Sequence, residues 1–283
     1  MTISARTMVT TRSVSFIAIT FVLSSVSAGA GYWLLQRGYP AAGQATAIFM
    51  MSCPGIAGVV CALLFERGRR LHALGIVFRP NWGWLLAYLG GVGFSGIALA
   101  TNIFIGRSTT HLPHNIYQFS IAFLLTNPLV QTILATIEEE LGWRGYLYYL
   151  WREAGFWQYS LWTGLMWGIW HAPGIILFKA NYPDAPWTGA LAFVLLCMLI
   201  APLMTLIRDK GKSVIAAGIC HGTLDATDIA STVIAKNSSP LWQGDGGIGG
   251  FVSAGVFAVG IALFQRYGTS AQSLRTHDKD THT

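Results

Sequence analysis

Long apolar stretches alternate with short polar segments along most of the chain. A helix needs about 20 mostly apolar residues to cross a bilayer. Eight stretches approach that length, at residues 13–36, 44–65, 82–105, 119–142, 157–178, 188–207, 213–235 and 248–265. The pattern predicts an all-α fold, a polytopic membrane protein with about eight transmembrane helices. We expect residues 1–268 to form one integral membrane domain and the polar residues 269–283 to form a disordered tail.

The basic residues lie mainly in every second segment between these stretches. With a cytoplasmic N-terminus, 14 of the 18 Lys and Arg residues lie on the cytoplasmic side, beginning with Arg6 and Arg12. The other side keeps Arg37, Arg107, Lys179 and Lys236. Cytoplasmic loops of membrane proteins carry such an excess of Lys and Arg. We therefore expect an integral membrane protein with both termini in the cytoplasm.

The composition agrees with a membrane location. Charged residues make up 11% of the chain, whereas soluble domains carry about 25%. Topology explains the net charge of +6, and no basic and aromatic pattern indicates nucleic acid, so the expected partner is the lipid bilayer. Four cysteines lie in apolar stretches without paired spacing, which favours packing roles over disulfides or a zinc finger. They are Cys53, Cys61, Cys197 and Cys220.

Three consecutive glutamates end the fourth apolar stretch, at positions 138 to 140. Residues four apart on an α-helix share a face, so Glu140 is placed to pair with Arg144, with the acid N-terminal to the base as is favourable. Glu139 points elsewhere and is left free for chemistry. Glu138 has no firm assignment and is interpreted as helix-end or cavity polarity.

Two further sites place ionisable groups within apolar stretches. His171 follows Trp167 by one helical turn, and His221 shares a helical face with Asp225, with Asp228 nearby. A single histidine in such a helix is about as often a structural hydrogen-bonding residue as a functional one, and an acid four residues before an arginine is usually a structural pair. Several such groups on separate helices are tolerated best if they meet in one polar intramembrane cavity.

A cavity of this kind suits hydrolysis. A carboxylate and a histidine can hold and deprotonate a water, and a second histidine can face the oxyanion of a tetrahedral intermediate. The same residues, Glu139, His171, His221 and Asp225, can alternatively bind zinc. Nucleophilic catalysis is less favoured because no G-x-S-x-G elbow is present, and no zincin H-E-x-x-H motif is present either.

These residues resemble the CPBP family of intramembrane endopeptidases, which includes the CAAX prenyl protease (Ras-converting enzyme) and bacteriocin-processing and immunity proteins. The family pattern is EExxxR, then FxxxH, then HxxxN or HxxxD, on separate transmembrane helices. The corresponding segments here run from Glu139 to Arg144, from Trp167 to His171 and from His221 to Asp225. The surrounding sequence is similar to that of bacterial members, so a bacterial cell membrane is the expected location.

The resemblance implies a role for each matching position. Glu139 corresponds to the general base that activates water, and His171 helps to position that water. His221 and Asp225 correspond to the pair that stabilises the oxyanion. Supporting positions are Glu140, Arg144 and Trp167. The mechanism implied is that of a glutamic endopeptidase without a cofactor, and the zinc-dependent version remains the alternative.

Two positions depart from the family pattern. Trp167 replaces Phe, which changes shape more than chemistry. Asp225 stands where many members have Asn, and an ionised Asp accepts hydrogen bonds but donates none. Asp225 must therefore be protonated, orient His221 or bind a metal.

We expect an endopeptidase that cleaves a protein or peptide substrate, including substrates that are anchored in the membrane. Two other classes remain open. A catalytically silent relative acting as an immunity factor or scaffold would retain the same motifs. A proton-coupled transporter also places acids and histidines in membrane helices, although the two halves of this chain show no repeated hydropathy pattern of the kind many transporters have.

Overall fold

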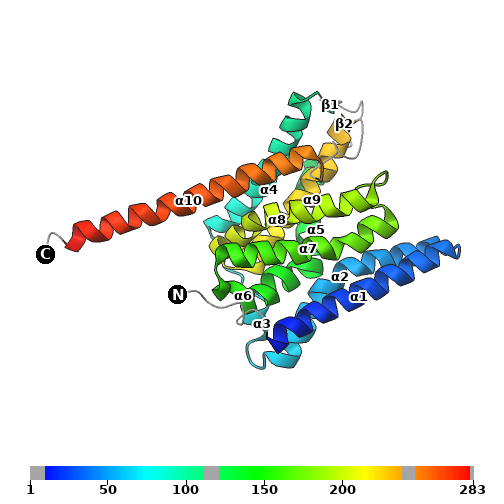
Figure 1. The fold of residues 1–283 in the computed structure, drawn as a ribbon, viewed down its shortest axis with the longest axis horizontal. Helices are drawn as coiled ribbons and strands as arrows, with labels where there is room; N and C mark the ends of the chain where they lie inside the picture. Colours follow the sequence, from blue (N-terminus) through cyan, green and yellow to red (C-terminus); the bar gives the residue numbers. More distant parts are fainter. Residues whose placement is uncertain (1–9, 107, 111–120, 238–245, 281–283) are drawn as a thin grey trace.

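The computed structural model describes residues 10–106, 108–110, 121–237 and 246–280 and is almost entirely helical (Figure 1). Its helices are α1 (Thr11–Gln36), α2 (Pro40–Phe65), α3 (Arg70–Ala73), α4 (Trp82–Phe104), α5 (Ile121–Ala135), the π-helix η3 (Thr136–Leu147), α6 (Tyr148–Trp151), the short helix η4 (Arg152–Ala154), α7 (Phe156–Phe178), α8 (Pro186–Gly211), α9 (Val214–Ile234) and α10 (Ile248–Asp280). Two short strands, β1 (Ser108–Thr110) and β2 (Ala235–Asn237), pair antiparallel, with Ser108 opposite Asn237. The predicted all-α class is confirmed.

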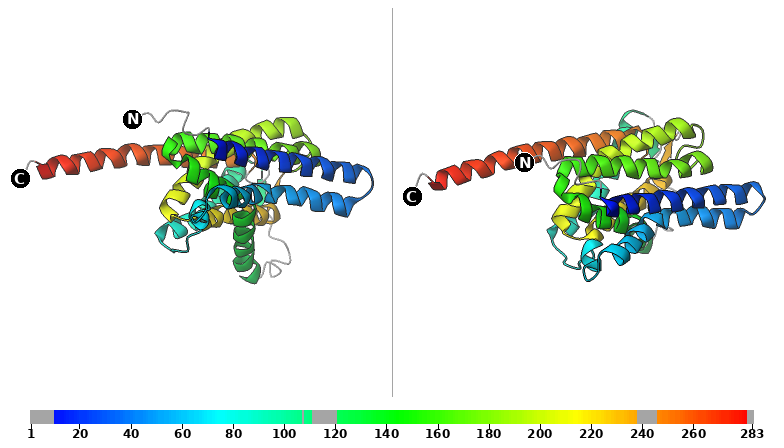
Figure 2. Two further views of the ribbon diagram at one scale, coloured as in Figure 1. Left: turned by 90° about the horizontal axis from the view of Figure 1, so that it is seen from below. Right: turned by 60° about the horizontal axis from the view of Figure 1, so that its bottom comes forward.

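Helices α1 and α2 form a hairpin along one side of the molecule (Figure 2). A capping box starts α1, since Thr10 and Ser13 each accept a hydrogen bond from the other's backbone N–H. The chain turns at Gly38, whose φ of 82° is the left-handed conformation that glycine adopts at little cost. Pro40 is the first residue of α2, where its fixed φ suits the helix. These local signals lay two apolar helices side by side.

The remaining helices build a bundle around η3. Helices α7 and α8 pack side by side, α9 packs against α4 and α5, and η3 contacts both α2 and α9 (Figure 1). The indole of Trp143, from η3, packs edge-on against Trp170 of α7 and Phe16 of α1, with ring centroids 6.2 and 5.6 Å apart. Trp170 also donates a hydrogen bond from Nε1 to Ser24 of α1 at 2.6 Å. This aromatic core ties η3 to two neighbouring helices, α1 and α7.

Six of the described helices are long and apolar enough to cross a membrane. They are α1, α2, α4, α7, α8 and the Ile248–Tyr267 part of α10. These helices correspond to six of the eight predicted spans. The predicted span 119–142 is divided between α5 and the π-helix η3, and the predicted span 213–235 contains α9 with its histidine and aspartates. The predicted count of eight spans therefore stays a prediction.

The backbone of helix α10 continues to Asp280 and projects beyond the bundle (Figure 1). The disordered tail expected over residues 269–283 stays a prediction, and residues 281–283 lie outside the described residues. A helix satisfies its backbone hydrogen bonds within itself, so a polar composition does not by itself end it. Arg6 and Arg107, which enter the predicted charge distribution, lie outside the described residues. The orientation of the termini stays a prediction.

Glycines let η3 approach α2 backbone to backbone. A Cβ placed on Gly142 would lie 2.4 Å from the carbonyl oxygen of Pro54 in α2, and one on Gly58 would lie 2.9 Å from the carbonyl oxygen of Leu141. Both distances are shorter than a carbon–oxygen contact allows. The position of the glutamates therefore depends on small residues at this crossing.

We expect Gly142→Ala to lower the free energy of unfolding by about 1–3 kcal/mol, because the added methyl group must displace the α2 backbone. Gly29→Ala in α1 is the matched control, since a Cβ there meets nothing within 4 Å. Thermal unfolding of the two variants in detergent measures the difference. An unchanged midpoint for Gly142→Ala would contradict the close packing of α2 and η3.

Candidate active site

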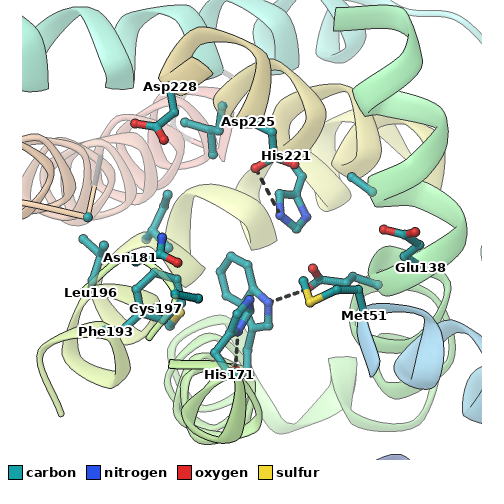
Figure 3. A pocket seen from close by; sticks show the side chains of 18 of the residues that line it. Met51, Glu138, His171, Asn181, Phe193, Leu196, Cys197, His221, Asp225 and Asp228 are labelled. Carbon is teal, nitrogen blue, oxygen red and sulfur yellow. Dashed lines mark hydrogen bonds and ion pairs between the residues drawn. The ribbon is translucent and has the colours of Figure 1, made fainter. Parts of the chain in front are cut away.

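The three glutamates lie on the π-helix η3, not on an α-helix. In a π-helix hydrogen bonds span five residues, so consecutive side chains are separated by a smaller angle than in an α-helix. Glu138 and Glu139 both line one cavity, whereas Glu140 is fully buried away from it. Glu138 extends toward the cavity from η3 (Figure 3). The structure thereby gives Glu138 a location that the sequence left open.

The carboxylate of Glu140 contacts an arginine and a histidine. Its Oε1 atom accepts a hydrogen bond from Nη1 of Arg144 at 2.9 Å and lies 2.8 Å from Nδ1 of His221 on α9. The Arg144 guanidinium also lies over the indole of Trp167, with Cζ 4.3 Å from the ring centroid. Glu140 is 0% exposed and Arg144 1%, so water cannot replace either partner. The ion pair that helical spacing predicts is present, and the link to His221 is an addition.

His221 is held by this contact at one ring nitrogen. With Nδ1 facing a carboxylate that only accepts, Nδ1 carries a proton. Nε2 lies 3.9 Å from Oδ1 of Asp225, one helical turn later on α9, which is too long for a direct hydrogen bond. Nε2 of His221 therefore remains available to a group that enters the cavity.

Glu139 is held by a tryptophan on α7. Nε1 of Trp167 donates a hydrogen bond to Oε2 of Glu139 at 2.6 Å, and Glu139 is 4% exposed. An indole N–H is a donor only, so the contact suits an ionised carboxylate. Trp167 stands where the family pattern has Phe, which lacks this donor. From the sequence, the exchange of Phe for Trp167 was expected to change shape more than chemistry. The structure shows that the indole also orients Glu139 through this hydrogen bond.

His171 lies one turn further along α7. Its Nδ1 lies 2.9 Å from the backbone carbonyl oxygen of Trp167, which only accepts, so Nδ1 carries a proton and a neutral ring leaves Nε2 as an acceptor. The ring is packed against Trp170 and Phe193, with centroids 4.4 and 4.8 Å away. No hydrogen bond within the described part of the chain joins His171 to Glu139. Both residues nevertheless border the same space.

That space is a cavity of about 420 Å³, lined by residues of η3, α7, α8 and α9 together with residues of α2, α4 and α5. Figure 3 shows His171 and His221 on facing sides, with Asp225 and Asp228 along α9. One wall, from α8, is apolar and consists of Phe193, Leu196 and Cys197 (Figure 3). The volume is in the range of ligand pockets in proteins. The cavity thus combines a polar side that carries ionisable groups with an apolar side.

The structure brings all four predicted site residues to this one cavity. They are Glu139, His171, His221 and Asp225. Glu138 and Asp228 border it as well and carry no role in the family pattern. The sequence pointed to all of these groups because they are ionisable residues within apolar stretches. Only the fold shows that they border the same cavity.

A metal ion is not well accommodated by these side chains as placed. Zinc sites in proteins use three or four protein ligands. Within residues that the structure describes, no three His, Cys, Asp or Glu side chains are grouped so that they could hold a metal ion.

Residues 121–227 match the family described as type II CAAX prenyl endopeptidase Rce1-like. The matched stretch includes every motif position from Glu139 to Asp225. The resemblance to the CPBP family is confirmed. No curated protein matched the chain. Together with the six long apolar helices, the Rce1-like match indicates an integral membrane endopeptidase of the CAAX protease type that acts on a peptide substrate.

Replacing Glu140 tests the buried ion pair. We expect Glu140→Gln to lower the free energy of unfolding by roughly 3–5 kcal/mol, because it leaves the Arg144 charge buried without a carboxylate. Glu138→Gln makes the same chemical change two residues earlier on a half-buried side chain that has no ion pair with the described residues. Chemical denaturation in detergent compares the two variants. Equal losses of stability would contradict the special role of Glu140.

Proposed function

We propose that the chain is a glutamic intramembrane endopeptidase in which Glu139 and His171 activate water, while His221 and Asp225 act on the oxyanion. The observation that supports this proposal best is that these four side chains, from three separate helices, border one cavity. Each of them is also fixed or faced by a neighbour, so the polar groups are preorganised. Preorganised groups are what electrostatic stabilisation of a transition state requires.

Water activation falls to Glu139. Its Oε2 atom is occupied by the indole of Trp167, so Oε1 is the oxygen that accepts a proton from water. Nε2 of His171 accepts the second hydrogen bond of that water and orients it. The resulting hydroxide attacks the carbonyl carbon of the scissile peptide bond, and the carbonyl oxygen becomes an oxyanion.

Collapse of the tetrahedral intermediate completes the reaction. The C–N bond breaks, and the proton held by Glu139 passes to the leaving amine, which regenerates the carboxylate. The second proton of the water passes from the new carboxyl group to the amine, so the products are a new carboxylate and a new ammonium group, with one water consumed. His221 donates from Nε2 to the oxyanion while its Nδ1 is held by Glu140. No covalent enzyme intermediate is needed.

Asp225 orients His221 in this mechanism. An ionised carboxylate cannot donate to an oxyanion, but Oδ1 lies 3.9 Å from Nε2 of His221 and can attract the proton on that nitrogen. The substrate oxygen then approaches the same N–H. This role accounts for Asp at a position where many family members have Asn.

The substrate we propose is a peptide segment at the membrane. When this segment is bound, its scissile bond lies between Glu139 and His221. One apolar side chain or lipid group of the substrate then packs against Phe193 and Leu196 of α8. The excess of basic residues in every second segment supports the proposal that both termini lie in the cytoplasm. The lipid bilayer is the surrounding solvent.

We expect Glu139→Gln to reduce kcat by about 10²–10⁴-fold, because the general base is lost while the shape is kept. Glu138→Gln is the control on the same cavity wall and is expected to keep kcat within about threefold, in line with the small effects of changes away from the reacting groups. Cleavage of a peptide library by purified protein in detergent measures both. Equal activity of Glu139→Gln and wild type would refute the mechanism, and a wild type that cleaves nothing would favour the silent immunity or scaffold relative.

Metal removal separates the two hydrolytic mechanisms. We expect peptide cleavage to survive dialysis against a chelator with less than about a twofold loss of kcat, because Glu139 and not a metal activates the water. Metal analysis of the dialysed protein verifies that zinc is gone. Loss of activity that added zinc restores would instead support the zinc-dependent protease.

A further inference from the structure

A second cavity, of about 230 Å³, lies apart from the candidate active site. It is formed by the segment that follows α3, by α6 and η4, and by the C-terminal end of α8. His72 at this site packs edge-on against Tyr149 of α6, with ring centroids 5.6 Å apart. The cavity is bordered by three cations, Arg152, Arg208 and Lys212, and by one carboxylate, Asp209. The balance of charge is therefore positive.

Arg208 is the buried cation of this group. It is 8% exposed, its Nε donates to the backbone oxygen of Arg144 at 2.7 Å, and its guanidinium lies over the ring of Tyr148 with Cζ 4.4 Å from the centroid. Among the described residues, no carboxylate lies within 4.0 Å of the guanidinium nitrogens, and the guanidinium makes no other hydrogen bond. Leaving a buried cation without an anion is costly.

The neighbouring Asp209 attracts Arg208 but forms no direct ion pair with it within 4.0 Å. Its Oδ1 atom accepts a hydrogen bond from the hydroxyl of Tyr148. Burial, reinforced by Asp209, raises the pKa of Tyr148, so this hydroxyl keeps its proton and continues to donate. Arg152 and Lys212 are exposed and form no ion pair with the described residues. All three cations thus have donors to offer a ligand.

Gly75 lets the backbone of the segment after α3 lie close to the guanidinium of Arg208. Gly75 has a φ of 66°, and a Cβ there would lie 2.5 Å from Nη2 of Arg208. The carbonyl oxygen of Gly75 accepts a hydrogen bond from the N–H of Val214 at 2.9 Å, which anchors this segment to the start of α9. The cavity is therefore preformed, and a side chain at position 75 would press against the guanidinium.

We propose that this cavity binds a phosphate group, carried by an anionic phospholipid headgroup or by a free phosphoester. A guanidinium offers paired N–H donors that match phosphate oxygens, and Lys adds a point charge. The cavity lies beside the basic segment between α2 and α4, which contains Arg67, Arg69, Arg70 and Arg79. Basic pockets between membrane helices on the cytoplasmic side bind lipid headgroups. The proposal is independent of the protease mechanism.

Thermal unfolding of the full chain tests this site with two probes. One arm compares nanodiscs of phosphatidylcholine with nanodiscs that also contain phosphatidylglycerol. The other compares inorganic phosphate with chloride at equal ionic strength in detergent. We expect an anionic probe to raise the unfolding midpoint, and we expect Arg152→Gln and Lys212→Gln each to weaken the apparent affinity about tenfold. Both substitutions lie on exposed residues and leave Arg208 in place.

Arg79→Gln is the control, since Arg79 is an exposed cation of the neighbouring segment that does not border the cavity. It should respond like wild type. A shift with phosphatidylglycerol alone identifies a lipid headgroup, and a shift that includes inorganic phosphate identifies phosphate itself as sufficient. The proposal is overturned if neither probe shifts the midpoint, or if the two cavity variants shift as much as Arg79→Gln.

Discussion

The candidate site depends on one buried carboxylate. Glu140 is inaccessible to water, and its Oε1 atom contacts both Arg144 within η3 and His221 on α9. A buried charge is tolerated only when its partners are close and well directed. The contact between Glu140 and His221 therefore fixes where η3 lies against α9. It thereby also sets the distance between the η3 and α9 walls of the cavity. Because Arg144 also stacks on Trp167, the same network extends to α7.

The neighbouring glutamates have different surroundings and hence different properties. Glu140 is neutralised, Glu139 receives a single indole N–H from Trp167, and Glu138 borders the cavity without an ion pair to the described residues. The π-helical backbone allows consecutive side chains to serve the cavity and the core at once. Three similar residues in sequence thus become a structural anchor, a candidate base and a third carboxylate on the cavity wall.

The sequence predicts what is local and periodic. It predicts the apolar helices from their length, and the Glu140–Arg144 pair from a spacing of four. It could not predict that His221 reaches Glu140, because that contact joins residues 81 apart through packing of α9 on η3. The Trp167 contact with Glu139 was missed for the same reason.

The most direct test of the account is the position of ordered water in an experimental structure of the wild-type protein with a non-cleavable peptide bound. We predict a water within about 2.6–3.2 Å of both the free carboxylate oxygen of Glu139 and Nε2 of His171, facing the carbonyl carbon of the peptide. A peptide carbonyl oxygen close to Nε2 of His221 would accompany it. A cavity in which Glu139 turns away to Arg144, with no water between Glu139 and His171, would contradict the mechanism.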